Sequence, residues 1–183
     1  MTPTFPLAER GARGYSTDEV DRFLRFARLA YDGADERAAM TATDIRHTAF
    51  AVVNRGGYDP AHVDAALERL EDAFALRERD LGIQQMGSAA WVAMQRETAQ
   101  VIVNRLARNA GRRFARTGPL ARGYKRSAVD AFTDVVSDYF QRGRALDVES
   151  VRRAAFPLER GGYREDQVDA VLDAVVAVMI AVR

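Results

Sequence analysis

The segment 105–126 concentrates positive charge in a chain whose net charge is only +1: it holds eight cations and no carboxylate. Such a segment can bind anionic lipid, where each cation near the surface contributes about 1 kcal/mol. It can also bind the phosphates of nucleic acid, or it can be a solvated helix end whose arginines pair with carboxylates elsewhere. The candidate residues for an anionic surface, with one from the N-terminal loop, are Arg13, Arg105, Arg108, Arg112, Arg113, Arg116, Arg122, Lys125 and Arg126.

No set of residues has the spacing of a catalytic, cofactor or metal site. The chain contains no cysteine, which excludes thiolate zinc sites and a cysteine nucleophile. His47 and His62 are the only histidines, and neither lies at a metal-ligand spacing from another ligand. We therefore expect a protein that is not an enzyme and that uses no cofactor or metal.

A short motif recurs four times along the chain. In each copy a Gly-Tyr pair is followed by Val five positions after the Tyr and by Asp six positions after it. Because each Asp occupies the same place in a separate copy, the four carboxylates do not read as one catalytic set. We expect them to act as first-turn charges near helix N-termini, or as partners of arginines in the preceding turns. The motif residues are Tyr15, Val20, Asp21; Tyr58, Val63, Asp64; Tyr124, Val129, Asp130; and Tyr163, Val168, Asp169.

Each copy of the motif predicts the start of a helix. In the second copy Asp59 is the N-cap and Pro60 the first helical residue, where a missing N–H costs nothing. Tyr58 and Val63 are then spaced as a hydrophobic staple. In the first copy the residues 16–19 read as a capping box. The third and fourth copies place Lys125 and Arg164 at the cap position, so packing must hold those helix starts.

Hydrophobic periodicity predicts helices throughout the chain and no strand. The expected helices cover about 17–31, a short segment capped by Thr43 and continuing to Val53, a segment from Pro60 with a break at Gly82 or Gly87, a long segment from Ser88, a segment through 129–140, a short one near Asp147, and 165–182. The last is apolar around most of its circumference, which predicts burial in a core or against a partner chain.

The four copies form a higher-order pattern. The first and third read Arg-Gly-Tyr, the second and fourth Arg-Gly-Gly-Tyr, and 109 residues separate Tyr15 from Tyr124 while 105 separate Tyr58 from Tyr163. We therefore predict an all-α protein with four helix-loop-helix repeats arranged as a duplicated tandem pair. The expected domains are 1–110, a repeat pair with a long connecting helix, and 111–183, a second repeat pair, packed as one compact helical domain.

These residues resemble the DivIVA-domain family of bacterial cell-division and polar-growth proteins. The family pattern is an Asp-Ile pair and a Phe ahead of a Gly-Tyr turn, followed by a helix that opens Glu-Val-Asp-x-Phe-Leu. Here Asp44-Ile45 and Phe50 precede Gly57-Tyr58, and the run from Glu19 to Leu24 follows Tyr15. The four copies cover well over half of the chain.

The resemblance implies a non-enzymatic scaffold that binds a protein partner, lies in the cytoplasm and contacts the inner membrane peripherally. In the family a loop with a bulky apolar residue and an Arg just before Gly-Tyr touches the membrane. Arg13 and Arg122 occupy the Arg position here, whereas Ala12 and Ala121 replace the apolar residue. Family members dimerise through this domain, so four copies in one chain predict either a monomer by internal repeat pairing or a homodimer. A nucleic-acid-binding helical protein that uses the segment 105–126 is the alternative function.

Overall fold

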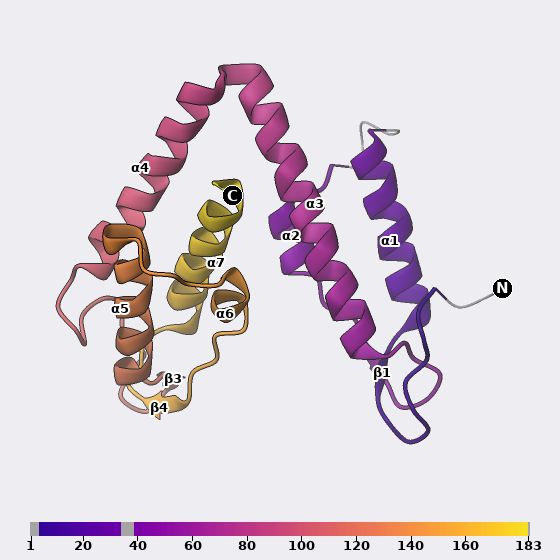
Figure 1. The fold of residues 1–183 in the computed structure, drawn as a ribbon. Helices are drawn as coiled ribbons and strands as arrows, with labels where there is room; N and C mark the ends of the chain where they lie inside the picture. Colours follow the sequence, from indigo (N-terminus) through magenta and orange to yellow (C-terminus); the bar gives the residue numbers. More distant parts are fainter. Residues whose placement is uncertain (1–3, 34–38, 183) are drawn as a thin grey trace. The chain divides into compact units, whose positions relative to one another are not determined.

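The computed structural model describes residues 4–33 and 39–182, and the chain forms two compact units, Met1–Asp80 and Leu81–Arg183 (Figure 1). The sequence predicted a division after residue 110, with both parts packed as one domain. The division instead falls at residue 80, because the helix that precedes residue 110 packs on the C-terminal helices. Its Ile102 and Leu106 are buried there.

Unit 1 contains two motif copies and the elements that follow each. Strand β1 leads directly into helix α1, and strand β2 leads through a turn into helix α3. Helix α3 continues past residue 80 into unit 2. The elements are β1 (Gly14–Tyr15), α1 (Thr17–Asp32), α2 (Ala42–Arg46), β2 (Val52–Val53) and α3 (Pro60–Met86).

Unit 2 repeats this order after one additional helix, α4. Its elements are α4 (Ser88–Leu106), β3 (Arg122–Tyr124), α5 (Arg126–Arg142), α6 (Val148–Arg152), β4 (Leu158–Arg160) and α7 (Glu165–Ala181). Helix α7 packs against α4 and α6, and α4 also packs against α5. The mostly helical architecture agrees with the predicted all-α class. Among the described residues, no helix is long and apolar enough to cross a membrane.

One helix start has its predicted cap, and two differ from their predicted form. Asp59 caps α3 as predicted, because its Oδ1 accepts a hydrogen bond from the Ala61 N–H at 2.8 Å. The predicted capping box at 16–19 is wrong: the Ser16 side chain caps nothing, and the Glu19 carboxylate accepts from the N–H of Ala51 instead. A capping box does form at α2, where Thr41, not Thr43, pairs with Asp44.

The prediction of no strand is also wrong. β1 pairs with β2 and β3 pairs with β4, both antiparallel. Because these strands are two or three residues long, no alternation of polar and apolar residues could reveal them. Val53, expected at the end of a helix, lies in β2, and the helix around Ile45 ends at Arg46. The break after α3 falls at Gly87, which has φ of 84°, and not at Gly82.

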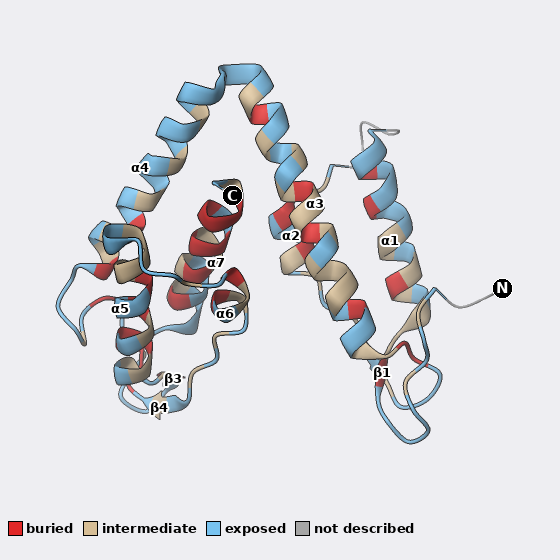
Figure 2. Cartoon of the chain, viewed as in Figure 1, coloured by how far each residue is buried: buried red, intermediate tan, exposed pale blue. Residues whose placement is uncertain are grey.

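The core of each unit lies where its helices meet (Figure 2). In unit 1, Ala30, Ile45 and Phe74 form one buried cluster and Val20, Tyr58 and Val63 another. In unit 2, α7 supplies more of the buried apolar side chains than any other element, and its composition predicted this burial. Burial against α4 and α6 explains why this helix is apolar on several faces, since a two-sided cover needs a wide apolar surface.

The glycine before each motif tyrosine lies where no side chain fits. A Cβ at Gly14 would lie 2.7 Å from the Gly57 carbonyl carbon, and one at Gly57 would lie 2.6 Å from that of Gly14. A Cβ at Gly123 would lie 2.2 Å from the Tyr163 carbonyl oxygen, and one at Gly162 2.5 Å from the Gly123 carbonyl oxygen. The two turns of each unit therefore touch backbone to backbone.

We predict that Gly123→Ala destabilises unit 2, because the contacted atoms are backbone and cannot rotate away. Overpacking a well-packed site costs about 1 to 3 kcal/mol, and a backbone clash lies at or above the upper end. Urea unfolding followed by the fluorescence of Trp91, the single tryptophan and a residue of α4 in unit 2, measures the effect.

Gly118→Ala is the matched control, because a Cβ there would have nothing within 4 Å. We expect its unfolding midpoint to stay near that of the wild type. Equal midpoints for both variants would show that the close approach at Gly123 is not a structural requirement.

Candidate functional site

Reciprocal backbone hydrogen bonds join the two Gly-Tyr turns of each unit. In unit 1 the Tyr15 N–H donates to the Tyr58 carbonyl and the Tyr58 N–H donates back to that of Tyr15, both at 2.9 Å. In unit 2 Tyr124 and Tyr163 make the same pair at 3.0 and 2.9 Å. The missing Cβ of the preceding glycines permits this approach.

Each motif tyrosine reaches across this pair to the motif aspartate of the other copy. The Tyr58 hydroxyl donates to Asp21 at 3.1 Å, and the Tyr163 hydroxyl donates to Asp130 at 2.9 Å. The Tyr124 hydroxyl donates to the Asp169 carboxylate over a longer distance of 3.5 Å. The Tyr15 side chain is hydrogen-bonded to that of Asp64. The aspartates were expected to serve helix N-termini or arginines of the preceding turns. They bind tyrosine hydroxyls because the turns cross, and Asp130 also lies 3.8 Å from the Arg113 guanidinium.

The motif valines lie under these tyrosines. All four, Val20, Val63, Val129 and Val168, are at most 1% exposed. Tyr58 and Tyr163 are also buried, whereas Tyr15 and Tyr124 are half-buried. The rings of Phe5 and Phe114 pack edge-on against Tyr58 and Tyr163, at centroid distances of 5.4 and 5.3 Å. Phe5 and Phe114 have the same separation in the sequence as Tyr15 and Tyr124, a signal that could have extended the repeat toward the N-terminus.

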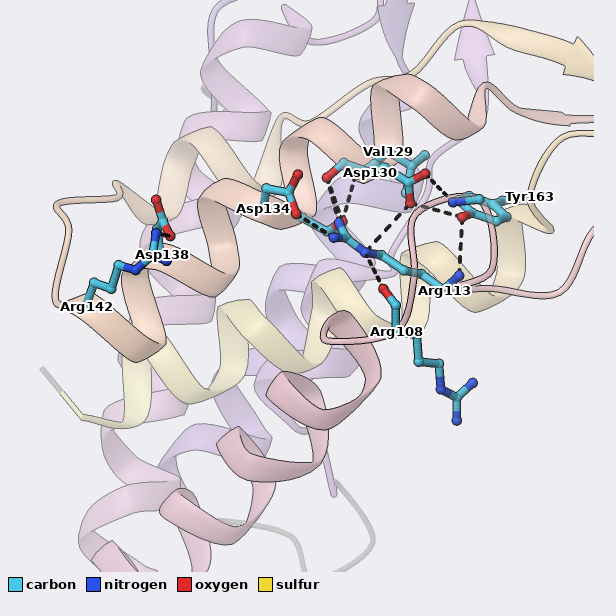
Figure 3. Close-up of polar contacts among 10 residues, drawn as sticks. Arg108, Arg113, Val129, Asp130, Asp134, Asp138, Arg142 and Tyr163 are labelled. Carbon is cyan, nitrogen blue, oxygen red and sulfur yellow. Dashed lines mark hydrogen bonds and ion pairs between the residues drawn. The ribbon is translucent and has the colours of Figure 1, made fainter.

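Arg113 belongs to the interior of unit 2 and not to its surface (Figure 3). It is 7% exposed, and its guanidinium donates to the Asp130 carbonyl and the Thr133 hydroxyl, both at 2.7 Å, and to Asp134 at 2.5 Å. Its backbone N–H donates to the Tyr163 hydroxyl. The prediction that Arg113 belongs to an anionic-surface set is wrong, because its guanidinium is buried and already hydrogen-bonded within the protein.

The other predicted cations separate into paired and exposed ones. Arg126 pairs with Glu159 at 3.1 Å, as the interpretation of arginines satisfied elsewhere in the chain predicted. The Arg116 guanidinium donates to the Gly161 carbonyl at 3.1 Å. Arg13, Arg108, Arg112, Arg122 and Lys125 are exposed and Arg105 half-buried, and among the described residues none of these six has a carboxylate at ion-pair distance.

The loop that enters β3 combines these cations with an exposed apolar side chain. Leu120 is 85% exposed, the highest value among the exposed large apolar side chains. Arg122 lies directly opposite Arg160 in the β3–β4 pair, and both are exposed. Like charges directly opposite one another in a sheet are destabilising, so this pair favours an anion in contact with it. Arg160 is absent from the cations predicted from the sequence, because only the strand pairing brings it beside Arg122.

The tyrosine hydroxyls are shielded from ionisation. Burial raises the pKa of Tyr163, and the neighbouring Asp130 carboxylate raises it further. Burial also raises the pKa values of Tyr124 and Tyr15, with Asp169 and Asp64 as the adjacent carboxylates. Burial likewise raises the pKa values of Asp64 and Asp169 themselves. The crossed pairs are therefore built around neutral phenols.

The described residues hold no cluster of three or more histidine, aspartate or glutamate side chains that could bind a metal ion. His62 Nδ1 lies 3.3 Å from the Asp59 carboxylate at the start of α3, as part of the helix cap. Comparison of the chain with protein-family models, with curated proteins and with solved structures found no significant match.

We predict that Tyr163→Phe destabilises unit 2 more than Tyr124→Phe does. The first change leaves the buried Asp130 carboxylate and the Arg113 N–H without their phenol partner, which costs about 1 to 3 kcal/mol. The second removes one long hydrogen bond to an exposed carboxylate and should stay within about 0.5 kcal/mol. Urea unfolding of the two variants beside wild type checks this; equal losses would contradict the unequal burial of the pairs.

We predict that stability falls as the pH rises above about 10, the ordinary pKa of tyrosine. There the unfolded chain loses phenol protons that the folded chain keeps, so the unfolded state binds fewer protons and the free energy of unfolding decreases with pH. Lys125 is the only lysine, so tyrosines dominate this range. Tyr163→Phe should flatten the decrease measured by urea unfolding from about pH 9 to 11; an unchanged slope would contradict the assignment.

Proposed function

We propose that this chain is a non-enzymatic scaffold of the DivIVA type, in which the four motif copies form two internally paired units. It would bind a protein partner in the cytoplasm and contact the anionic inner membrane peripherally during cell division or polar growth. The observation that carries the membrane contact lies in the segment 116–125, the loop before β3 together with β3 itself. There the exposed Leu120 lies among cations without carboxylate partners.

The recurrence of contacts in the two units supports a duplicated tandem pair. Beyond the crossed tyrosines, the N–H groups of Thr4 and Arg113 donate to the hydroxyls of Tyr58 and Tyr163. Phe50 packs on Tyr15 at 5.7 Å, and Phe156 packs on Tyr124 at 5.3 Å. Matching contacts at matching positions favour one ancestral pair that was duplicated, and pairing within each unit favours a monomer.

The charge and shape of the 116–125 loop support contact with an anionic membrane. Arg116, Arg122 and Lys125 would lie near lipid phosphates, each contributing about 1 kcal/mol. Burying the Leu120 side chain in the acyl boundary adds about 1.5 to 3 kcal/mol. Together these terms suffice for weak, reversible binding of the kind peripheral proteins show.

The position of Leu120 accounts for the alanine before Arg122. The resemblance to the DivIVA family led us to expect a bulky apolar residue at position 121, and Ala121 departs from that pattern. Leu120 lies one residue earlier, and its side chain is 85% exposed. In unit 1 the residue before Arg13 is also alanine, and Gly11 precedes it, so we assign the membrane contact to unit 2.

Vesicle sedimentation tests the proposal. We expect the wild type to sediment with vesicles that contain anionic phosphatidylglycerol and not with neutral vesicles. Leu120→Ser combined with Arg122→Gln should reduce the bound fraction by about tenfold, because both the apolar and the charge term are lost. Arg22→Gln with Arg25→Gln, two exposed cations of α1, is the control that changes charge outside the loop.

Two outcomes would overturn the membrane contact. One is equal loss of binding in the loop variant and in the α1 control, which would indicate non-specific attraction. The other is no binding to either vesicle together with binding to duplex DNA that weakens steeply with salt. The second result would favour the nucleic-acid-binding alternative for the segment 105–126.

A further inference from the structure

The two turn pairs differ by one residue, and the difference opens a pocket in unit 1. Both pairs begin alike: the Ser16 N–H donates to the Ala51 carbonyl, and the Lys125 N–H donates to that of Pro157. From there to the motif tyrosine, unit 1 has one residue more than unit 2. The β1–β2 pair ends at Gly14 and Val53, whereas β3–β4 continues to Arg122 and Arg160. The register places the extra residue at Asn54.

In unit 2 the two loops close on one another. The Gly161 N–H donates to the Ala121 carbonyl at 2.9 Å, and Arg116 covers Gly161 by donating to its carbonyl oxygen. In unit 1 the equivalent Gly56 N–H has no hydrogen-bond partner among the described residues. Leu7 occupies the position of Arg116, since both form the bridge to the second tyrosine of their unit. Gly56 therefore keeps a free backbone donor.

The result is a cavity of about 640 Å³ between the loops 7–12 and 54–56. Gly11 and Gly56 both have positive φ, 91° and 70°, and a Cβ at either would have nothing within 4 Å. The volume lies within the range of small-molecule sites, which is about 300 to 1,000 Å³. The cavity is open to solvent, and its walls are turns in which Gly11 and Gly56 leave space that larger side chains would fill.

The charged groups in the cavity wall are Arg10, Arg55 and Glu9. None of the three has an ion-pair partner among the described residues. Two guanidinium groups and one carboxylate leave a net charge of +1, which a singly charged anion balances. Guanidinium forks bind the oxygens of carboxylate and phosphate groups through paired N–H donors.

We propose that this cavity, defined here as the Arg10–Arg55 pocket, binds a ligand through a singly charged oxyanion, either a carboxylate or a phosphodiester. The oxyanion lies between the guanidinium groups of Arg10 and Arg55 and accepts a hydrogen bond from the free Gly56 N–H. Glu9 faces a hydrogen-bond donor on the same ligand. The site is in unit 1, so it is independent of the membrane contact proposed for unit 2.

Amide chemical shifts of the isotopically labelled full chain test the pocket. Dimethyl phosphate and acetate are the two probes, titrated separately so that the better binder identifies phosphodiester or carboxylate as the preferred group. We expect a saturable shift of the Gly56 amide and none at Gly161, whose N–H is already bonded within the protein. Arg10→Gln with Arg55→Gln should weaken binding by about tenfold or more, while Arg22→Gln with Arg25→Gln should leave it unchanged.

Deletion of Asn54 provides a second test that needs no ligand. The shortened turn matches the length of its counterpart in unit 2, so we expect Gly56 to bond to Ala12 and its amide hydrogen to exchange about tenfold more slowly. The probe-induced shift should disappear in this variant. The proposal is overturned if neither probe shifts Gly56, if the arginine variant binds as tightly as wild type, or if the deletion leaves the shift intact.

Discussion

The reciprocal backbone bond between two Gly-Tyr turns is the contact on which each unit depends. The bond forms only because the glycines leave no Cβ between the two turns. A Cβ at any of these glycines would lie 2.2 to 2.8 Å from backbone atoms of the other turn. The bond fixes the positions of both tyrosines, and each helix begins a fixed number of residues later. One backbone constraint therefore sets the entry points of two helices and, through them, the site where the core forms.

The crossing of the turns also explains how polar groups come to lie in that core. Each tyrosine ring buries apolar area while its hydroxyl reaches an aspartate on the helix of the other copy. The two units complete this pair differently. In unit 1 the Thr4 hydroxyl donates to Asp21, whereas in unit 2 the Gly111 N–H donates to Asp130 and the Arg113 side chain encloses the pair. A satisfied network tolerates such variation because burial requires only that each donor and acceptor finds some partner.

The loops beyond the crossed turns are free to diverge because they do not set the positions of the helices. In unit 2 the loop is closed and carries Leu120 with unpaired cations, which supports the proposed membrane contact. In unit 1 one inserted residue leaves the loops apart around Arg10 and Arg55. A rigid, repeated frame with variable tips is the usual arrangement for binding proteins, since loops tolerate changes that elements do not.

Local patterns in the sequence predicted most of the helices and the repeated motif. Asp59-Pro60 predicted the start of α3, and the apolar positions of α7 predicted its burial, because capping and periodicity are local properties. The contacts between distant residues became visible in the folded chain alone. The four aspartates bind tyrosines of the neighbouring copy, and Arg160 lies beside Arg122, through strands too short to leave a pattern in the sequence. Arg113 is buried through contacts with α5 residues that follow it by about 20 positions. Contacts between distant segments depend on how the turns cross, and no local preference encodes that crossing.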